Sequence, residues 1–273
     1  MELTGYDVRA FLAEDVGDGD VTAEAVVPVD ARLDATILLK EDGIVCGLEI
    51  AEAVLRELDP SLLFERLADG GDRVRGEIAR VSGGARALLT GERTALNLLG
   101  RLSGIATLTR QYVDAVAGTG TGTGTLILDT RKTTPGLRAL EKLAVRTGGG
   151  TNHRFGLYDA VLIKDNHLRL GGGVAASVRL AKETGLAVEV ECETLRDVEA
   201  ALEAGADTIL LDNMTPAQLR DAVGLVRGRA LTEASGGITL ETIREVAATG
   251  VDAISVGALT HSARSLDVSM EVR

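Results

Sequence analysis

Cationic side chains gather in one stretch of an otherwise acidic chain. Residues 131–169 contain eight Lys or Arg against three Asp or Glu, a local balance of +5, whereas the whole chain carries a formal net charge of −12. Two of the three histidines, His153 and His167, fall within the same stretch. A basic island in an acidic protein indicates a site for an anionic ligand.

The cations at the two ends of this stretch follow apolar runs that are typical of buried strands. Arg131 and Lys132 come just after residues 126–128, and Lys164 comes directly after residues 160–163. Cations at the end of a buried strand suit the lining of a pocket for a polyanion. The middle of the stretch has a simpler interpretation, a solvated helix face with i,i+4 charge spacing. The residues of that predicted face are Arg138, Glu141, Lys142 and Arg146.

Acidic side chains recur at every second residue in a later apolar segment. In the run 187–192 (AVEVEC), Glu189 and Glu191 alternate with valines, and Glu193 continues the pattern. Period two places all three on one strand face. Such a face indicates a barrel interior or a metal site, although a solvated edge strand is the alternative. Asp212 ends the next predicted strand, and two carboxylates from adjacent strands suit a substrate-bound Mg²⁺.

Two glycine-containing segments have the character of phosphate loops. Ser235, Gly236 and Gly237 precede a predicted helix that begins near Thr239, and Gly257 precedes a shorter segment that contains His261. Glycines before a helix N-terminus leave backbone N–H groups available to a phosphate. On the last two strands of a β/α barrel, these are the positions at which barrels commonly bind phosphate.

Lys164 also admits a different chemistry, a Schiff base in a barrel lyase. That reading leaves the cations at positions 131, 132, 153 and 154 unexplained, because one carbonyl substrate does not require so many. A non-catalytic phosphate sensor is a third possibility. It would not require the Glu191/Asp212 pair.

The second half of the chain alternates strand-like and helical segments, which predicts parallel strands with right-handed crossovers. The predicted strands are 126–129, 159–163, 186–190, 207–211, 229–232 and 252–256, and the predicted helices are 173–183, 194–204, 215–226 and 239–248. Polar residues end these strands at intervals of 21 to 27 residues, as expected where each βα unit brings one polar group to the same rim. About six strands are fewer than the usual ~8 of a closed barrel. A doubly wound sheet is the competing architecture, but no early GxGxxG motif supports it.

The first hundred residues have a mixed α+β pattern. The expected elements are a helix over 7–15, a turn over 17–22, two strands within 33–45 around a turn at 41–43, a helix over 47–58, strands over 73–81 and 85–89, and a helical run over 90–118 interrupted near Ser103–Gly104. Residues 119–125 (TGTGTGT) are expected to form a flexible loop.

Composition excludes several classes of protein. Aromatic residues amount to 2%, there is no Trp, and the net charge is negative, so nucleic-acid binding is not expected. Cys46 and Cys192 are far apart and give neither a zinc pattern nor a disulfide framework. The N-terminal segment is amphipathic and acidic rather than signal-like, and no apolar run reaches the ~18 residues of a membrane span. A soluble cytoplasmic protein is therefore expected, with the cysteines in packing roles.

Several motifs, taken in chain order, resemble the quinolinate phosphoribosyltransferase family (nicotinate-nucleotide pyrophosphorylases, carboxylating type). They are LAEDVGDGDVT (12–22), TGERTALNLLGRLSGIAT (90–107), DTRKTTPGLRALEKLAVRTGGGTNHRFGL (129–157), LIKDNH (162–167), EVE (189–191), LLDN (210–213), EASGGI (233–238) and VGALTHS (256–262). Arg101 stands where the family often has His. A paralogue tied to molybdate-uptake operons lacks the Asn-His-Arg and Lys-Asp-Asn-His pattern, which is present here.

The resemblance implies an α/β fold with two domains. Residues 1–106 would form an N-terminal α/β sandwich (α+β) domain, with 265–273 packing back on it, and residues 107–264 an open, incomplete six- to seven-stranded parallel α/β barrel. It also implies a homodimer with shared active sites, and the reaction of quinolinate with 5-phosphoribosyl 1-pyrophosphate to give nicotinate mononucleotide, CO₂ and pyrophosphate, with Mg²⁺.

The resemblance further implies roles for particular residues. Quinolinate would be bound by Arg131, His153, Arg154, Lys164 and, from the neighbouring subunit, Arg93. Phosphoribosyl pyrophosphate would be bound by Lys132, Lys164, Glu191, Asp212, Ser235, Gly236, Gly257 and His261. Lys132, Glu191 and Asp212 would be the catalytic residues, and Glu191 and Asp212 would face the Mg²⁺ that the substrate carries.

Overall fold

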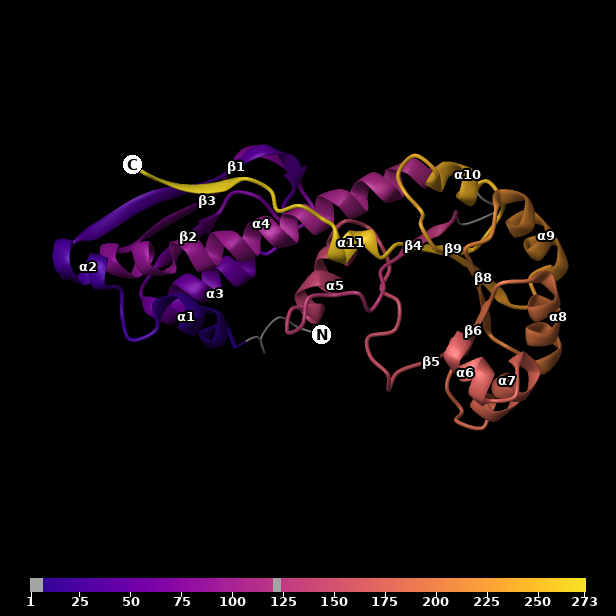
Figure 1. The fold of residues 1–273 in the computed structure, drawn as a ribbon. Coiled ribbons are helices and arrows are strands. Elements are labelled where there is room, and N and C mark those ends of the chain that lie inside the picture. Colours follow the sequence, from indigo (N-terminus) through magenta and orange to yellow (C-terminus); the bar gives the residue numbers. More distant parts are fainter. Residues whose placement is uncertain (1–6, 120–123) are drawn as a thin grey trace. The chain divides into compact units, whose positions relative to one another are not determined.

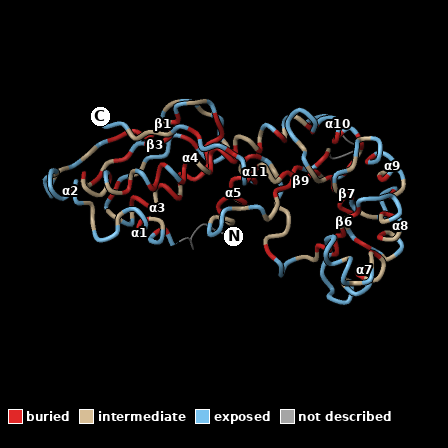
Figure 2. Tube along the Cα trace, viewed as in Figure 1, coloured by how far each residue is buried: buried red, intermediate tan, exposed pale blue. Residues whose placement is uncertain are grey.

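The structure is a computed structural model that describes residues 7–119 and 124–273. The chain divides into two compact units (Figure 1). Unit 1 comprises Met1–Leu108 and Ala263–Arg273, and unit 2 comprises Thr109–Ser262. Residues 120–123, in the predicted flexible loop, lie outside the described residues. In each unit the buried residues follow the strands and the inner sides of the helices (Figure 2).

Unit 1 is an antiparallel sheet covered by helices. Its described strands pair in the order β10-β1-β3-β2. The strands are β1 (Arg32–Ile44), β2 (Leu63–Arg66), β3 (Arg73–Gly84) and β10 (Val268–Val272), and the helices are α1 (Arg9–Val16), α2 (Val21–Val26), α3 (Leu48–Leu58) and the first part of α4 (Ala85–Val116). In α3 the buried residues recur with helical spacing and face α4, where Leu55 and Leu58 lie over Gly91. The C-terminal strand β10 pairs with β1.

Several local expectations for unit 1 were wrong. The two strands expected within 33–45 are one long strand, Arg32–Ile44, with register irregularities. Part of the predicted turn at 17–22 begins α2, because the Asp20 carboxylate caps that helix by accepting from the amides of Thr22 and Ala23. Residues 82–84 extend β3, and 85–89 begin α4 instead of forming a strand.

Helix α4 is continuous through Ser103 and Gly104, where an interruption was expected. A Cβ at position 104 would lie 1.9 Å from the carbonyl oxygen of Arg264, so this glycine permits a close approach of two backbone segments. Ser103 Oγ lies 3.0 Å from the amide nitrogen of Cys46, which donates to it. Both residues therefore serve packing between elements of unit 1.

Unit 2 is a parallel sheet whose outer face is covered by helices (Figure 1). Its described strands pair in the order β4-β9-β8-β7-β6-β5. The strands are β4 (Leu126–Leu128), β5 (Val161–Ile163), β6 (Val188–Cys192), β7 (Thr208–Asp212), β8 (Leu231–Ser235) and β9 (Ala253–Ser255). The helices are α5 (Arg138–Thr147), α6 (Asp165–Leu170), α7 (Val174–Lys182), α8 (Leu195–Ala204), α9 (Pro216–Val226), α10 (Ile243–Ala247) and α11 (Ala258–His261).

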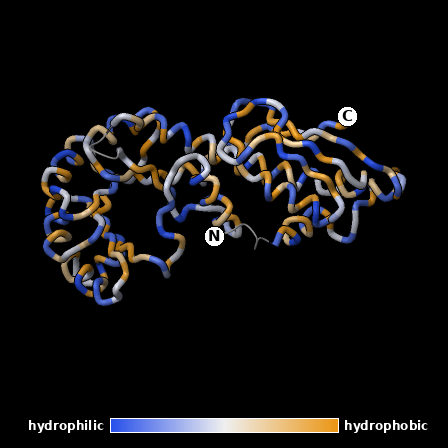
Figure 3. Tube along the Cα trace, turned by 180° about the vertical axis from the view of Figure 1, so that it is seen from behind, coloured by the Kyte–Doolittle hydropathy of each residue, from blue (hydrophilic) through white to orange (hydrophobic). Residues whose placement is uncertain are grey.

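The sheet of unit 2 is an open barrel. In the part of the chain that the structure describes, β4 and β5 do not pair, and the segment between them joins β4 through a single bridge from Leu128 to Thr151. The predicted α/β fold, with an α+β domain and an incomplete barrel, is therefore confirmed. The predicted helix at 239–248 begins four residues late, at Ile243. Hydrophobic and hydrophilic residues alternate along the helices of both units (Figure 3).

Alternation along β6 sorts its side chains between two environments. Val188, Val190 and Cys192 are fully buried, on the side where α7 and α8 contact the strand. Glu189 and Glu191 take the opposite side, inside the barrel. Burial raises the pKa of Cys192 to about 12, consistent with a packing role for this thiol.

Candidate functional site

A cavity of about 280 Å³ opens at the C-terminal ends of the strands of unit 2. Its lining includes the predicted anion-binding residues Arg131, Lys132, His153, Arg154, Lys164 and Ser235, together with Thr130, Leu162, Leu210, Glu233 and Ser255. The cations and Thr130 come from the loops that flank the opening between β4 and β5, and the remaining residues come from the strands. The structure thus brings together in one pocket cations that are 33 residues apart in sequence, from 131 to 164.

Arg131 and Arg154 are poised to bind an anion. The Nε atom of each guanidinium is buried and has no hydrogen-bond partner among the described residues. Burial lowers the pKa of Arg154, and the nearby charge of Arg131 lowers it further. Two partly desolvated guanidiniums with unused donors are electrostatically unfavourable unless an anion lies between them. Carboxylates suit such planar donors bidentately.

Lys164, Glu191 and Asp212 form a charged cluster at the rim. Lys164 Nζ lies 3.0 Å from Glu191 Oε2. Carboxylate oxygens of Glu191, Glu193 and Asp212 all lie within 4.8 Å of one another. Burial raises the pKa of Asp212, and the negative charge of Glu191 raises it further. Such a cluster of oxygen ligands gains stability from a divalent cation, so its chemistry fits Mg²⁺.

A second acidic cluster lies deeper in the barrel. His153 Nε2 is 2.9 Å from Glu189 Oε2 and 3.7 Å from Glu233 Oε2. Burial raises the pKa of Glu233 to about 7, and the charge of Glu189 acts in the same direction. Burial alone would lower the pKa of His153, but the hydrogen bond to Glu189 and the two carboxylate charges outweigh it and raise that pKa. Glu233 is therefore the carboxyl group of this cluster that retains a proton near neutral pH.

This inner cluster has the residue types of a metal site, but the imidazole is oriented against one. The backbone N–H of Arg154 donates to His153 Nδ1 over 2.7 Å. Nδ1 is then an acceptor, and the proton of a neutral ring must reside on Nε2, where it points to Glu189. A metal on Nε2 would require the proton on Nδ1, opposite another N–H donor. A neutral imidazole that donates to Glu189 thus fits this geometry better than a metal ligand.

The phosphate-loop candidates lie along the last strands. Gly236 has φ +99°, and a Cβ there would lie 2.2 Å from Asn213 Oδ1, so a side chain is excluded. A Cβ at Gly257 would lie 3.1 Å from both His261 Nε2 and Lys132 Cδ. Gly257, His261 and Lys132 are therefore neighbours, and Thr260 Oγ1 donates to the carbonyl of Lys132 over 2.8 Å.

Arg93 differs from the other predicted site residues. It is an exposed residue on α4 in unit 1, whereas the others belong to unit 2. Its predicted role is to act on the site of a neighbouring subunit.

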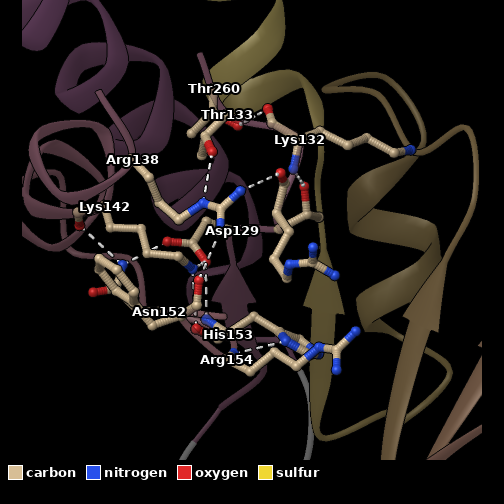
Figure 4. A network of polar contacts seen from close by, with 12 residues as sticks. Asp129, Lys132, Thr133, Arg138, Lys142, Asn152, His153, Arg154 and Thr260 are labelled. Carbon is tan, nitrogen blue, oxygen red and sulfur yellow. Dashed lines mark hydrogen bonds and ion pairs between the residues drawn. The ribbon is translucent and has the colours of Figure 1, made fainter. Parts of the chain in front are cut away.

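The predicted solvated helix face was wrong at its two central residues, whereas Arg146 is exposed as predicted. Glu141 and Lys142 on α5 are fully buried, and Glu141 accepts from the amide and hydroxyl of Thr134 at 3.0 and 2.8 Å. Arg138 donates to Thr133 Oγ1 over 2.9 Å, and Lys142 is paired with Asp129 (Figure 4). The central part of the face is thus covered by the loops around it.

Sequence reasoning also missed part of the site. Glu189 was placed on a functional strand face without a role, and Glu233 likewise appeared without a role, as the first residue of the motif at 233–238. For Glu189, the available signal was its alternation with apolar residues along the strand. Asp129, which precedes the basic motif, had no signal beyond its place at the end of β4.

The fold and this site define a class of protein: an α/β barrel with an anion-binding pocket on its rim, where cations and acids are arranged as in an enzyme active site. Comparison with known proteins gives the family. The model of the quinolinate phosphoribosyl transferase C-terminal domain matches residues 105–271, and that of the N-terminal domain matches residues 20–103. This chain belongs to the quinolinate phosphoribosyltransferase family.

Curated relatives and solved structures agree with this assignment. The chain is 45% identical to a probable nicotinate-nucleotide pyrophosphorylase [carboxylating] of Bacillus subtilis, covering 96% of this chain and 91% of the relative. It is 43% identical to a chloroplastic enzyme of that name from rice, covering 98% and 78%. The crystal structure of NadC from Streptococcus pyogenes matches with a TM-score of 0.93 at 39% identity, covering 99% of this chain and 98% of the other.

Proposed function

We propose that this protein is a decarboxylating quinolinate phosphoribosyltransferase. It would convert quinolinate and 5-phosphoribosyl 1-pyrophosphate to nicotinate mononucleotide, CO₂ and pyrophosphate, a step of NAD biosynthesis. The observation that carries the proposal is the single cavity in which Arg131 and Arg154 present unused guanidinium donors beside Lys164. A pyridine with two adjacent carboxylates is complementary to that arrangement. The relatives named above carry the same activity in their names.

The cations and acids of the pocket suit the two halves of this reaction. Arg131, Arg154 and Lys164 would hold the quinolinate carboxylates, and His153 would lie beside them. The partner subunit's Arg93 would complete the pocket. Glu191 and Asp212 would face the ribose, where they stabilise positive charge that develops as pyrophosphate leaves. Lys132 would contact the leaving phosphates.

The phosphoribosyl donor needs a second set of groups. Backbone at Gly236 and Gly257, with Ser235 and His261, would bind phosphate. Mg²⁺, which the substrate would bring, would be held by Glu191 and Asp212 and would neutralise pyrophosphate charge. The exposed position of Arg93 on α4 is consistent with a homodimer that completes each site from the neighbouring subunit.

The order of the chemistry follows from the electronics of the ring. The pyridine nitrogen lone pair forms the bond to ribose C1 as the C1–oxygen bond to pyrophosphate breaks. The C2–carboxylate bond then breaks, its electron pair stays on the ring carbon beside the positive nitrogen, and a proton replaces CO₂. Decarboxylation should therefore require the ribosyl donor.

No observation favours the lyase alternative. A Schiff-base lysine attacks as a neutral amine, whereas Lys164 is ion-paired with Glu191 over 3.0 Å.

We further propose a cytoplasmic enzyme. No helix in the described ranges 7–119 and 124–273 has the length and apolar character of a membrane span.

The decisive assay supplies carboxyl-labelled quinolinate, phosphoribosyl pyrophosphate and Mg²⁺, and follows labelled CO₂ and nicotinate mononucleotide. We expect both products in equal amounts, and no CO₂ when the ribosyl donor is omitted. Arg154→Ala should lose about 10²-fold or more in kcat/KM, since it removes a charge-assisted pair with substrate. An Arg154→Ala enzyme with the kcat/KM of wild type would contradict the proposal, and so would CO₂ release without the ribosyl donor.

A further inference from the structure

Asp129 and Lys142 form an ion pair that is fully removed from solvent. Both side chains are 0% exposed, and Lys142 Nζ contacts Asp129 Oδ1 directly. Burial raises the pKa of Asp129 and lowers that of Lys142, so desolvation acts against both charges. A buried pair of this kind is weak support for stability, because two well-packed apolar side chains often do as well. Its hydrogen bonds indicate what else it does.

The remaining hydrogen bonds of the pair converge on residues 152 and 153 (Figure 4). Asp129 Oδ1 accepts from the backbone N–H of His153 over 2.9 Å, and Lys142 Nζ donates to the carbonyl of the same residue over 3.0 Å. The Asn152 amide donates to Asp129 Oδ2 and to the carbonyl of Lys142. One ion pair thus fixes both backbone polar groups of His153.

This network occupies the opening of the barrel. In the described residues, β4 and β5 lack the ladder that joins every other neighbouring pair of strands in this sheet. Asp129 directly follows β4, and His153 lies eight residues before β5 begins at Val161. The side chains of the pair therefore connect two chain segments that backbone ladder bonds do not join, beyond the bridge at Leu128 and Thr151.

The segments joined in this way carry the two guanidiniums of the pocket. Arg131 lies two residues after Asp129, and Arg154 directly follows His153. Arg138, one turn before Lys142 on α5, reinforces the arrangement by donating to the carbonyls of Arg131 and Phe155 at 3.5 and 3.2 Å. Any shift between the segments would change the distance between the two guanidiniums.

We propose that the Asp129–Lys142 pair is a positioning device that sets the separation of Arg131 and Arg154 for a substrate with two adjacent carboxylates. This inference rests on the proposed function. Neither residue would contact the substrate. Misplacement of binding groups by about 1 Å can cost on the order of 10²-fold in rate. Loss of the pair should therefore act on quinolinate recognition more than on phosphoribosyl pyrophosphate.

The test compares three variants of the whole protein. Lys142→Met leaves a buried carboxylate unpaired, and Asp129→Leu/Lys142→Met replaces both charges with apolar side chains of similar size. Asn152→Ala removes one link and leaves the ion pair intact. Lys182→Met is the matched control, since Lys182 forms an exposed pair with Asp207 elsewhere in unit 2. Melting temperature, kcat and the KM of each substrate are measured for all.

The double variant separates positioning from stability. We expect it to regain most of the melting temperature lost in Lys142→Met, while its KM for quinolinate stays about tenfold or more above wild type and its KM for phosphoribosyl pyrophosphate changes little. Asn152→Ala should show the same KM pattern more weakly, with near-wild-type melting. If the double variant does not fold, the KM values of Asn152→Ala decide the test. Lys182→Met should match wild type.

Two results would overturn the inference. One is a folded double variant with wild-type KM for quinolinate, and the other is an equal rise in both KM values in every variant, including Asn152→Ala. The proposed function is tested separately by the wild-type enzyme. If wild type neither turns over nor binds quinolinate in a calorimeter, the function fails. If wild type is active and the variants match it, the positioning role alone fails.

Discussion

Glu189 and Glu191 are two residues apart on the same face of β6, yet they meet different chemistry. Glu191 is half-buried at the rim, paired with Lys164 and close to Asp212 and Glu193. The Glu189 side chain is 11% exposed, almost the same as the 12% of Glu191, but it contacts His153 and lies within 4.8 Å of Glu233. At the rim, the Lys164 ammonium compensates part of the like charge. Deeper in, the compensation is a proton on Glu233, whose pKa burial raises to about 7.

The comparison shows how one strand can supply two kinds of acid. Moving two residues along a strand shifts a side chain by about 6–7 Å. In this barrel that distance separates groups that suit a metal-bound substrate from groups that hold a proton near neutral pH. Removing a charge at the rim should therefore lower activity with little effect on stability. Removing a charge at the inner level should mainly change stability.

The largest effect is expected at the rim. Glu191→Gln removes a charge that faces the ribose and frees Lys164 from its ion pair. We expect kcat to fall by about 10²–10³-fold, the range seen when a group that stabilises transition-state charge is lost. The melting temperature should change little, because glutamine keeps the size of the side chain and can still accept a hydrogen bond from Lys164. Steady-state kinetics with a parallel thermal melt provides the measurement. An unchanged kcat would remove Glu191 from the reaction.

A smaller effect, on stability rather than rate, is expected at the inner level. The pKa of Glu233 in the folded protein is about 7, above its ordinary 4.5. Between these values the folded state binds the extra proton, so the free energy of unfolding falls as pH rises from about 4.5 to above 7.

Glu233→Gln should abolish much of this dependence. Relative to wild type, the variant should gain on the order of 1–3 kcal/mol at pH 8 and little at pH 4.5. Denaturant unfolding at both pH values provides the measurement, with Glu193→Gln as a control on an exposed acid. A constant difference between variant and wild type across the range would mean that Glu233 is not protonated near neutrality.

The smallest effect is expected from Glu193→Gln itself. Glu193 is exposed and completes the outer acidic cluster. If that cluster faces Mg²⁺, losing one of its three carboxylates should raise the Mg²⁺ concentration needed for half-maximal turnover by a few-fold, about 1 kcal/mol or less for an exposed charge. Titrating Mg²⁺ at saturating substrates would show it. A larger effect than that of Glu191→Gln would reverse the proposed order of the two levels.

Much of the architecture could be predicted from the sequence. Strand–helix alternation in the second half predicted parallel strands, and six of them pair in the described part of unit 2. The period-two acids of β6 predicted a functional strand face. By contrast, residues 85–89 were expected to form a strand and instead begin α4. A short apolar run fits a strand or a buried helix turn equally well, and only the elements packed against it decide.

By itself the sequence determined the periodicities, the strand-end positions of Arg131, Lys164, Glu191 and Asp212, and the family. These are local properties, carried by spacing along the chain. The tertiary structure alone decided that Lys142 is a buried ion-pair partner and not a solvated lysine, because Asp129 and Asn152, 13 and 10 residues away, cover it. It likewise decided that Glu189 contacts His153. Burial and contacts depend on which segments converge in space, and spacing along the chain does not reveal this.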